Sequence, residues 1–227
     1  VLRSPEGAPG RAYFEKRKLS GATIKHFGLG YAPNSFDSLR NHLRSKGFTD
    51  EEMVAGYLCQ RSKKNEKAIY DCFRNRVMFP IIDTAGNVIA FGGRVLDDSV
   101  PKYLNSADTP AFKKSRNLFA LNYAKNHTDN GFILCEGYMD VIALHAAGFE
   151  NAVATLGTAI TPEQSRIMKK YTDKIVISYD SDEAGQKAAN RAIGLLEEAG
   201  IDAKVLRMTG AKDPDEYIKK FGAESFR

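Results

Sequence analysis

Short apolar runs alternate with helix-like periods in the second half of the chain. From residue 131 onward, apolar residues at spacings of three or four separate four runs of strand length. The predicted strands are GFILC, NAVAT, KIVISY and AKVLRM, and the predicted helices are MDVIALHAAGF, TPEQSRIMKKY and DEAGQKAANRAIGLLEEAG, with a loop leading into a last helix in DPDEYIKKFG. Such alternation is typical of α/β proteins with a mostly parallel sheet covered by helices.

The first half of the chain instead predicts a mixture of α and β elements. Two apolar runs in RVMFPIIDTAGNVIAFGGRVL, joined by the Gly-containing loop DTAGN, predict a β-hairpin. PKYLNS is predicted to be extended, and KNEKAIYDCF fits neither a helix nor a strand. Helices are predicted in YFEKRKLSGATIKHF, SFDSLRNHLRSKGF, TDEEMVAGYLCQRS and TPAFKKSRNLFALNYAKNH. We therefore expect a mixed α/β subdomain over residues 1–127, a parallel-sheet subdomain over 128–212 and the start of a helical subdomain over 213–227.

The composition fits a folded protein without membrane spans or disulfides. Of the 227 residues, 43% are hydrophobic, and no apolar stretch approaches the ~20 residues that a membrane span needs. The three cysteines form no C-x-x-C pair, which argues against structural zinc and favours a cytoplasmic setting. Because the chain begins at Val1 and not at Met, and stops just after a helical pattern, we expect a fragment of a longer protein.

The net charge of +5 hides an asymmetry between the two halves. Residues 1–127 carry 21 Lys and Arg against 12 Asp and Glu, whereas residues 128–227 carry 12 against 16. The basic half is expected to contact a polyanion, and the acidic half to hold cations. A merely solvated basic face is the alternative, and charge alone does not decide between the two.

Five carboxylates each follow an apolar run or a turn in the acidic half. They lie in GFILCEGYMDV, KIVISYDSDEAG and TGAKDPDEY and are Glu136, Asp180, Asp182, Asp213 and Asp215. Residues just past the carboxyl ends of parallel strands gather in one crevice, where acids repel each other unless they share protons or bind cations. Oxygen-only ligands suit Mg²⁺ or Mn²⁺ and not zinc. Asp140, four residues after Glu136, is a candidate for orienting a ligand.

Each acidic segment also has an explanation without metal. Glu136 could be a turn acid that caps the following helix, and Asp182 could be an N-cap with Asp180 incidental. Asp213 could begin a solvated helix whose first position is a proline. Gly185 costs about 1 kcal/mol relative to Ala inside a helix, which hints at a close approach to its backbone.

Cationic residues of the basic half recur beside glycines, aromatic residues and amides. The candidates for nucleotide or nucleic-acid binding are Arg17, Arg74, Arg76, Arg94, Lys102, Tyr103, Asn105 and Lys114. Arg74 and Arg76 stand at strand spacing and are predicted to point the same way. Gly92 and Gly93 would let a ligand or a partner strand approach the backbone, and arginine forks suit phosphate oxygens. A surface strand of arginines is the alternative.

At this level of detail the motifs resemble a known family. EGYMDVIAL, ATLGTAIT and YDSDEAGQKAA resemble the Toprim domain, a Rossmann-like domain shared by bacterial primases, topoisomerases and some nucleases. RNRVMFPI, GNVIAFGGRVL and PKYLNS resemble the N-terminal part of the catalytic core of bacterial replicative (DnaG-type) primases. The resemblance covers nearly the whole chain and implies a DNA-templated RNA polymerase that makes short primers for replication.

The resemblance also implies roles for the candidate residues. Glu136, Asp180 and Asp182 match the catalytic and metal-binding acids of Toprim domains. Asp213 and Asp215 match further acids of that cluster, which would hold two or more Mg²⁺ or Mn²⁺ ions. Six of the binding candidates match primase residues that handle the nucleoside triphosphate or the template–primer: Arg74, Arg76, Arg94, Lys102, Asn105 and Lys114. The family's zinc-binding domain has no trace here, and its helicase-binding domain would lie beyond the last residue.

The implied partners are a single-stranded DNA template, ribonucleoside triphosphates and, through the domain absent here, the replicative helicase. A crevice that offers metals and cations to a triphosphate is also expected to accept guanosine tetraphosphate as a competitor. We expect a monomer and no membrane partner. Three alternatives stay open: a Toprim nuclease or topoisomerase fragment, a phosphatase that uses the D-x-D at a strand end, and a non-catalytic metal-dependent nucleic-acid-binding module.

Overall fold

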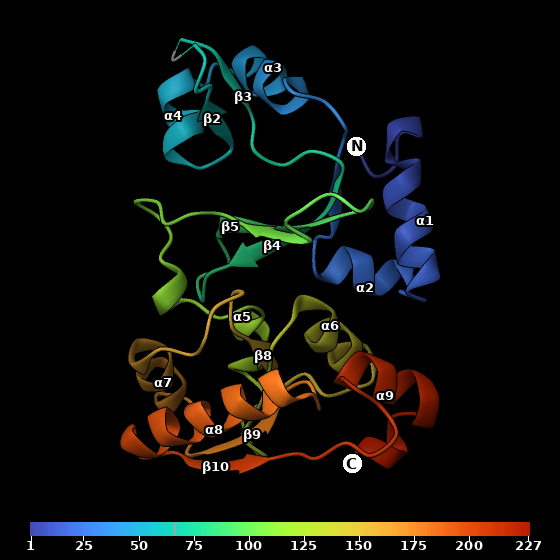
Figure 1. The fold of residues 1–227 in the computed structure, drawn as a ribbon, viewed down its shortest axis with the longest axis vertical. Helices are drawn as coiled ribbons and strands as arrows, with labels where there is room; N and C mark the ends of the chain where they lie inside the picture. Colours follow the sequence, from blue (N-terminus) through green and yellow to red (C-terminus); the bar gives the residue numbers. More distant parts are fainter. Residues whose placement is uncertain (66) are drawn as a thin grey trace. The chain divides into compact units, whose positions relative to one another are not determined.

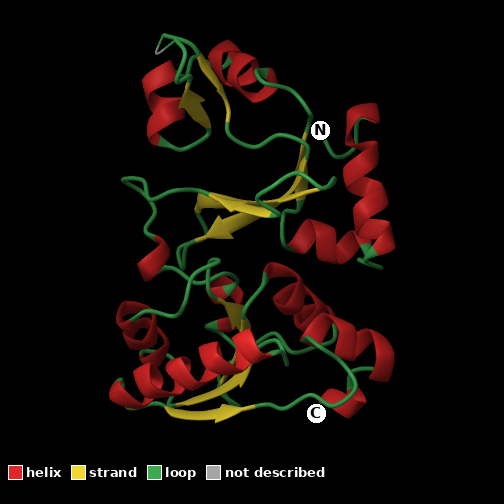
Figure 2. Ribbon diagram, in the orientation of Figure 1, coloured by secondary structure: helices red, strands yellow, loops and turns green. Residues whose placement is uncertain are grey.

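The computed structural model describes residues 1–65 and 67–227, which form two compact units (Figures 1 and 2). Unit 1 consists of Val1–Ile81 and Val88–Lys113, and unit 2 of Ile82–Asn87 and Lys114–Arg227. The subdomain boundaries predicted after residues 127 and 212 stay predictions. Glu66, in the undecided segment KNEKAIYDCF, lies outside the described residues. Within those residues, no helix is long and apolar enough to cross a membrane.

Unit 1 is built on a four-stranded sheet with the strand order β1-β4-β5-β6. Its strands are β1 (Gly30–Ala32), β4 (Arg76–Ile82), β5 (Val88–Val95) and β6 (Tyr103–Asn105). The predicted hairpin is confirmed, because β4 and β5 are neighbours and the Asp83 carboxylate accepts the N–H groups of Ala85 and Asn87 in the loop. Val77, Phe79 and Ile81 alternate along β4 and are fully buried, which fixes the face that this strand turns to the core.

The long helix predicted over YFEKRKLSGATIKHF is wrong, because the chain forms two separate helices there. The helices of unit 1 are α1 (Ala8–Lys16), α2 (Gly21–His26), α3 (Ser38–Ser45) and α4 (Asp50–Ala55), and a 3-10 turn covers Pro5–Gly7. Lys18 adopts a left-handed conformation with φ of 61°, which no helix can continue. Two residues later the Ser20 hydroxyl accepts the N–H of Thr23 at 3.0 Å and caps α2.

The helix predicted over TDEEMVAGYLCQRS also ends early, at Ala55. Tyr57 has φ of 56° and turns the chain out of the helix. The residues after it form β2 (Cys59–Arg61), which pairs antiparallel with β3 (Ile69–Asp71). The inner side chains of this pair pack with Met53 of α4, so tertiary packing overrides the helical spacing of the sequence.

The parallel sheet predicted for the second half is confirmed in unit 2. Its strand order is β10-β9-β7-β8, and all three pairings are parallel (Figure 1). The strands are β7 (Phe132–Cys135), β8 (Ala152–Ala154), β9 (Lys174–Ser178) and β10 (Asp202–Val205). The helices between and after them are α6 (Tyr138–Ala146), α7 (Pro162–Lys169), α8 (Glu183–Glu198) and α9 (Pro214–Phe221). β7, an inner strand, and β8, the last strand of this order, are both buried along their whole length, as expected for strands of a covered sheet.

The helix predicted over TPAFKKSRNLFALNYAKNH is largely absent. The segment contains a 3-10 turn at Lys114–Arg116 and the single-turn helix α5 (Leu121–Ala124). Between them Phe119 exchanges backbone hydrogen bonds with Ala154, extending the sheet beside β8. Ala120 then has φ of 64°, so the chain leaves the extended conformation before α5 begins. The Phe119 ring is buried in this extended conformation, which explains why the apolar spacing of the segment does not produce a helix.

Asp71 stabilises the start of α3 although it lies 31–32 residues away in the sequence. Its carboxylate accepts the backbone N–H of Leu39 at 2.7 Å and that of Arg40 at 2.9 Å. Asp37 occupies the N-cap position itself but makes no side-chain cap. The first-turn amides of α3 are therefore satisfied by the β2–β3 pair and not by the local sequence.

We expect Asp71→Ala to lower the free energy of unfolding by about 2 kcal/mol, because two helix amides lose their acceptor. The matched change Asp37→Ala removes an aspartate from the cap position and should change stability by no more than about 0.5 kcal/mol. Urea denaturation of both variants checks this. Equal losses for the two variants would contradict the assignment of the cap to Asp71.

Candidate active site

Two adjacent strands bring Glu136 and Asp180 together at the carboxyl edge of the unit 2 sheet. β7 and β9 are parallel neighbours in which Cys135 lies beside Ser178. Glu136 follows Cys135 directly, and its Oε1 accepts the backbone N–H of Asp180 at 3.2 Å. The structure thus joins two acids that lie 44 residues apart in the chain.

Glu136 does not cap α6, which rules out the metal-free explanation considered for it. The N-cap of α6 is Gly137, which provides no side-chain cap. Burial raises the pKa of Glu136, and the charges of Asp180 and Asp182 raise it further, while the Asp180 N–H lowers it. Glu136 is therefore a half-buried carboxylate that holds a proton more readily than an exposed one does.

Asp182 begins α8 at the same edge of the sheet. Its Oδ1 accepts the N–H of Gly185 at 2.8 Å, so the N-cap explanation is confirmed for this residue. The side chain is exposed, and its second oxygen takes no part in that cap. A Cβ at Gly185 would overlap the carbonyl oxygen of Asp180. The group that approaches the backbone of this glycine closely is therefore another part of the same chain and not a ligand.

Asp140 is the most perturbed acid of the site. It lies on α6 with 9% of its surface exposed, and a Cβ at Gly137 would lie 2.9 Å from its Oδ2. Burial raises the pKa of Asp140 to about 8, and the charges of Asp213 and Asp180 contribute to that rise. The backbone N–H of Asp215 donates to its carboxylate and acts in the opposite direction.

Asp213 and Asp215 differ in their environments although they are only two positions apart. Asp213 is the N-cap of α9 and accepts the N–H of Glu216 at 2.7 Å. This agrees with the alternative in which Asp213 begins a helix. Asp215 is buried, and its Oδ2 lies 2.6 Å from the Nζ of Lys219. α9 packs against α6, which places both acids beside Asp140.

The acids fit divalent cations by their chemistry. All the candidate ligands are carboxylates, and the pKa values of Glu136 and Asp140 are raised partly by the charge of their acidic neighbours. A bound cation would offset that repulsion. Across residues 1–65 and 67–227, however, no three His, Cys, Asp or Glu side chains are arranged as a finished metal site.

Arg74 and Arg76 do not point the same way, because the strand spacing between them is broken. β4 begins only at Arg76, and Asn75 before it has φ of 49°. The Arg74 guanidinium lies 4.5 Å from the ring centre of Phe36 and donates to the Asp71 carbonyl. Arg76 is buried and donates to the carbonyl of Gly93 at 3.1 Å, and burial lowers its pKa.

Gly93 was expected to let a ligand or a partner strand approach the backbone, but side chains of unit 1 lie there instead. A Cβ there would lie 2.8 Å from the ring of Phe73 and 3.0 Å from Arg76 Cδ. The space beside this glycine is therefore filled by side chains of unit 1 and not by a ligand.

Two of the predicted cations converge on an aromatic ring that the sequence did not single out. The guanidinium carbon of Arg94 lies 4.9 Å from the ring centre of Tyr13, and that of Arg17 lies 5.5 Å from it. Tyr13 and Arg17 are on one helix face at i and i+4, which could have indicated their contact. The ring thus gathers two positive charges from α1 and β5 on one surface.

Three of the remaining binding candidates lie on the edge strand β6 or next to it, and the fourth lies in unit 2. Lys102 and Tyr103 are exposed, and Tyr103 stands opposite Arg94 in the strand register. Asn105 stands opposite Gly92. Lys114 is half-buried in the 3-10 turn at the start of the second segment of unit 2.

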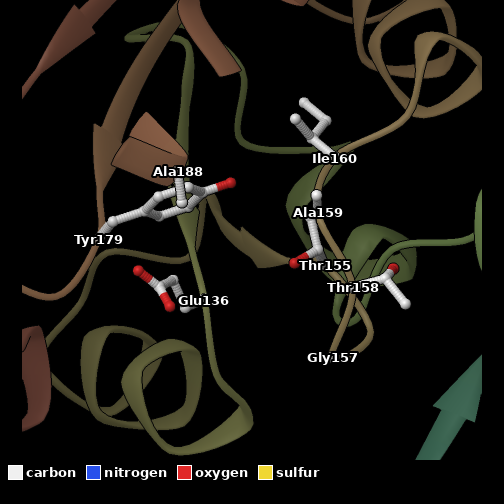
Figure 3. A pocket seen from close by; sticks show the side chains of 8 residues that line it. All are labelled: Glu136, Thr155, Gly157, Thr158, Ala159, Ile160, Tyr179 and Ala188. Atoms are coloured by element: carbon white, nitrogen blue, oxygen red, sulfur yellow. The ribbon is translucent and has the colours of Figure 1, made fainter. Parts of the chain in front are cut away.

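A pocket of about 360 Å³ lies directly beside Glu136 (Figure 3). It is lined by Glu136, Thr155, Gly157, Thr158, Ala159, Ile160, Tyr179 and Ala188. Apart from Glu136, none of these was predicted, because their side chains are neutral and form no charged motif in the sequence. The signal was present, since the loop TLGTAI follows the strand NAVAT and so also leaves the carboxyl edge of the sheet. Burial raises the pKa of Tyr179, so its hydroxyl stays protonated at neutral pH.

Comparison with protein families identifies both parts of the chain. Residues 1–125 match the model of the N-terminal domain of the DNA primase catalytic core, and residues 133–218 match a Toprim-like model. The chain belongs to the DNA primase catalytic core family. The primase match of the first half does not favour a Toprim nuclease or topoisomerase, which the acids alone would have allowed.

Curated relatives and solved structures agree with this family. The chain is 50% identical to a DNA primase of Clostridium acetobutylicum over 95% of its length, and 40% identical to one of Halalkalibacterium halodurans over 100%. It spans only 36% and 38% of these two relatives. A DNA primase domain from Pseudomonas aeruginosa superimposes with a TM-score of 0.90 at 39% identity, covering 100% of this chain and 72% of that one. A DnaG primase catalytic domain bound to single-stranded DNA gives 0.88 at 37% identity, covering 99% and 71%.

We expect Asp140→Asn to raise the free energy of unfolding of the metal-free protein, and to raise it much more at pH 8 than at pH 5. A chelator keeps the protein free of metal. In the folded primase core this carboxyl stays protonated until about pH 8, whereas in the unfolded chain it ionises near pH 4. The stability that wild type gains from this proton is present at low pH and is lost as the pH rises toward 8. Asn keeps an acceptor and cannot ionise.

The variant's advantage in free energy of unfolding should therefore grow by on the order of a few kcal/mol between pH 5 and pH 8. Denaturant titrations in EDTA at the two pH values measure it. Asp202→Asn, at an exposed site on β10, is the control and should show no such growth. A pH-independent difference for Asp140→Asn would show that the carboxyl is ionised throughout.

Proposed function

We propose that this chain is the catalytic core of a primase, which makes short RNA primers on single-stranded DNA by divalent-metal-dependent nucleotidyl transfer. The observation that carries the proposal is the meeting of Glu136 with Asp180 at the carboxyl edge of the sheet, in a chain of the primase family. The reaction forms a bond between a 3′-oxygen and the α-phosphorus of a nucleoside triphosphate. Pyrophosphate leaves, and the proton of the 3′-hydroxyl must be accepted.

In this proposal Glu136 accepts that proton or binds a metal ion, and its raised pKa favours the first role. Asp180, Asp182, Asp213 and Asp215 would hold two or more Mg²⁺ or Mn²⁺ ions through their carboxylate oxygens. Asp140 would orient this group through its contact with the Asp215 amide. When bound, such ions lower the pKa of an attacking hydroxyl and neutralise charge on a triphosphate.

The basic residues of unit 1 would bind phosphates. Arg17 and Arg94 on Tyr13, the exposed Lys102 and Tyr103, and Asn105 offer cations, a stacking surface and an amide for a nucleotide or a strand. Arg74 would add to this positive surface, and Lys114 would offer a further cation on unit 2. Arg76 would contribute by holding the backbone of β5 and β6 from within, since it is buried. Binding should weaken as salt is added.

The proposed partners follow from this chemistry and from the family. They are a single-stranded DNA template and ribonucleoside triphosphates, with guanosine tetraphosphate as a competitor for the same cations. One related catalytic domain is described as bound to single-stranded DNA, which supports a template of that kind here. A replicative helicase would be contacted through a domain outside this chain. We propose a cytoplasmic monomer.

We expect Asp180→Ala or Glu136→Gln to lower primer synthesis at least about 100-fold while the unfolding midpoint stays within a few degrees. The control is Asp173→Ala, which removes an aspartate from the opposite end of β9, where the side chain only pairs with Lys169 on the surface. Incorporation of labelled ribonucleotides on a single-stranded template is the assay. Full activity in either well-folded site variant would refute the proposed function.

We also expect Tyr13→Leu to raise the KM for ribonucleoside triphosphates about three- to tenfold, because Arg17 and Arg94 lose the ring that gathers them. Tyr13→Phe keeps the ring. It should behave like wild type, because the Tyr13 hydroxyl has no hydrogen-bond partner among the described residues. Steady-state kinetics of the two variants make the comparison. If leucine and phenylalanine gave the same KM, the ring would have no part in binding.

A further inference from the structure

The pocket beside Glu136 is a built site that the metal and phosphate chemistry leaves unused. It lies between Tyr179, which follows β9, and the loop of residues 155–160, which follows β8 (Figure 3). Figure 3 shows the hydroxyls of Tyr179 and Thr155 directed toward the space between them, with the Glu136 carboxylate beside the Tyr179 ring, whereas the hydroxyl of Thr158 is directed away from Glu136. Tyr179 and Thr155 are 7% and 6% exposed, so their positions are fixed by the surrounding core.

The lining excludes a phosphate as the occupant. Its described residues include no Lys, Arg or His, and its one ordinarily charged group is the carboxylate of Glu136. The lining itself offers an anion no positive side chain to offset that charge. The other walls are the apolar side chains of Ile160, Ala159 and Ala188. A neutral ligand with hydroxyl groups and a flat apolar face matches this surface, and a volume of about 360 Å³ lies in the range of small-molecule sites.

We propose that this pocket holds the nucleoside of the primer's 3′-terminal ribonucleotide, with the Thr155 hydroxyl hydrogen-bonded to the ribose 2′-hydroxyl. The inference rests on the proposed function, in which the 3′-hydroxyl must reach Glu136. A ribose in the pocket presents its 2′- and 3′-hydroxyls on one edge. One of them then faces Thr155 while the other faces the carboxylate that accepts its proton. Tyr179 closes the pocket and donates from its hydroxyl.

This placement assigns a selective role to a neutral residue. A site that hydrogen-bonds a hydroxyl discriminates against a ligand that lacks it, because its own polar group is then left without a partner. Thr155 would therefore make the enzyme prefer a primer that ends in a ribonucleotide over one that ends in a deoxyribonucleotide. The template and the incoming triphosphate would not be affected, since neither occupies the pocket.

The test extends two primers that differ only in their last sugar, ribose or 2′-deoxyribose, on one template with the full chain. Wild type should prefer the ribose end in kcat/KM. Thr155→Val replaces a hydroxyl by a methyl of similar size and should reduce that preference about three- to tenfold. The KM for the incoming nucleotide should stay the same. Thr128→Val is the matched control, because Thr128 precedes β7 at the end of the strand opposite Glu136.

A second variant keeps the proposal testable if Thr155→Val fails to fold. Ala159 is exposed, so Ala159→Leu adds bulk to the pocket wall without disturbing the core. It should raise the KM for both primers and leave the KM for the incoming nucleotide unchanged. If wild type extends both primers and both variants keep the wild-type primer preference and KM values, the assignment of the pocket is overturned but the proposed function is not. Wild type that extends neither primer would instead overturn the proposed function.

Discussion

The parallel register of β7 and β9 is the constraint on which the rest of the candidate site depends. It sets Cys135 beside Ser178, so the residues that follow must leave the sheet at the same edge. The repulsion between the acids gathered there is reduced by one hydrogen bond from the Asp180 amide to Glu136 and by one from the Asp215 amide to Asp140. The backbone thus supplies positive partial charges to Glu136 and Asp140, and Lys219 adds a full positive charge beside Asp215.

Sequence reasoning succeeded where it used strand ends and failed where it used spacing alone. The alternation of apolar runs predicted the sheet of unit 2, and the strand-end rule then located Glu136 and Asp180. Helical spacing misled in unit 1, because the left-handed residues Lys18 and Tyr57 interrupt the helices although neither is a Gly or a Pro. Thr155 was missed because a neutral side chain carries no chemical signature until its neighbours are known.

The arginines of unit 1 show that residue type does not determine environment. Arg76 and Arg94 were both expected to bind phosphate, yet one is a buried donor to backbone carbonyls and the other lies over an aromatic ring. Desolvation lowers the pKa of the buried one. Only the structure separates Arg76, which is buried, from Arg94, which is half-buried against the Tyr13 ring.

The capping role of Asp182 and Asp213 has a consequence for how these positions can vary. Each side chain uses Oδ1 to cap a helix, α8 or α9, and carries a second carboxylate oxygen that takes no part in that cap. Glutamate has the same charge, but its longer side chain is a poor N-cap, so it would free the helix ends. A cation drawn to these oxygens would therefore also tighten the first turns of two helices, coupling the order of α8 and α9 to the ionic conditions of the cell.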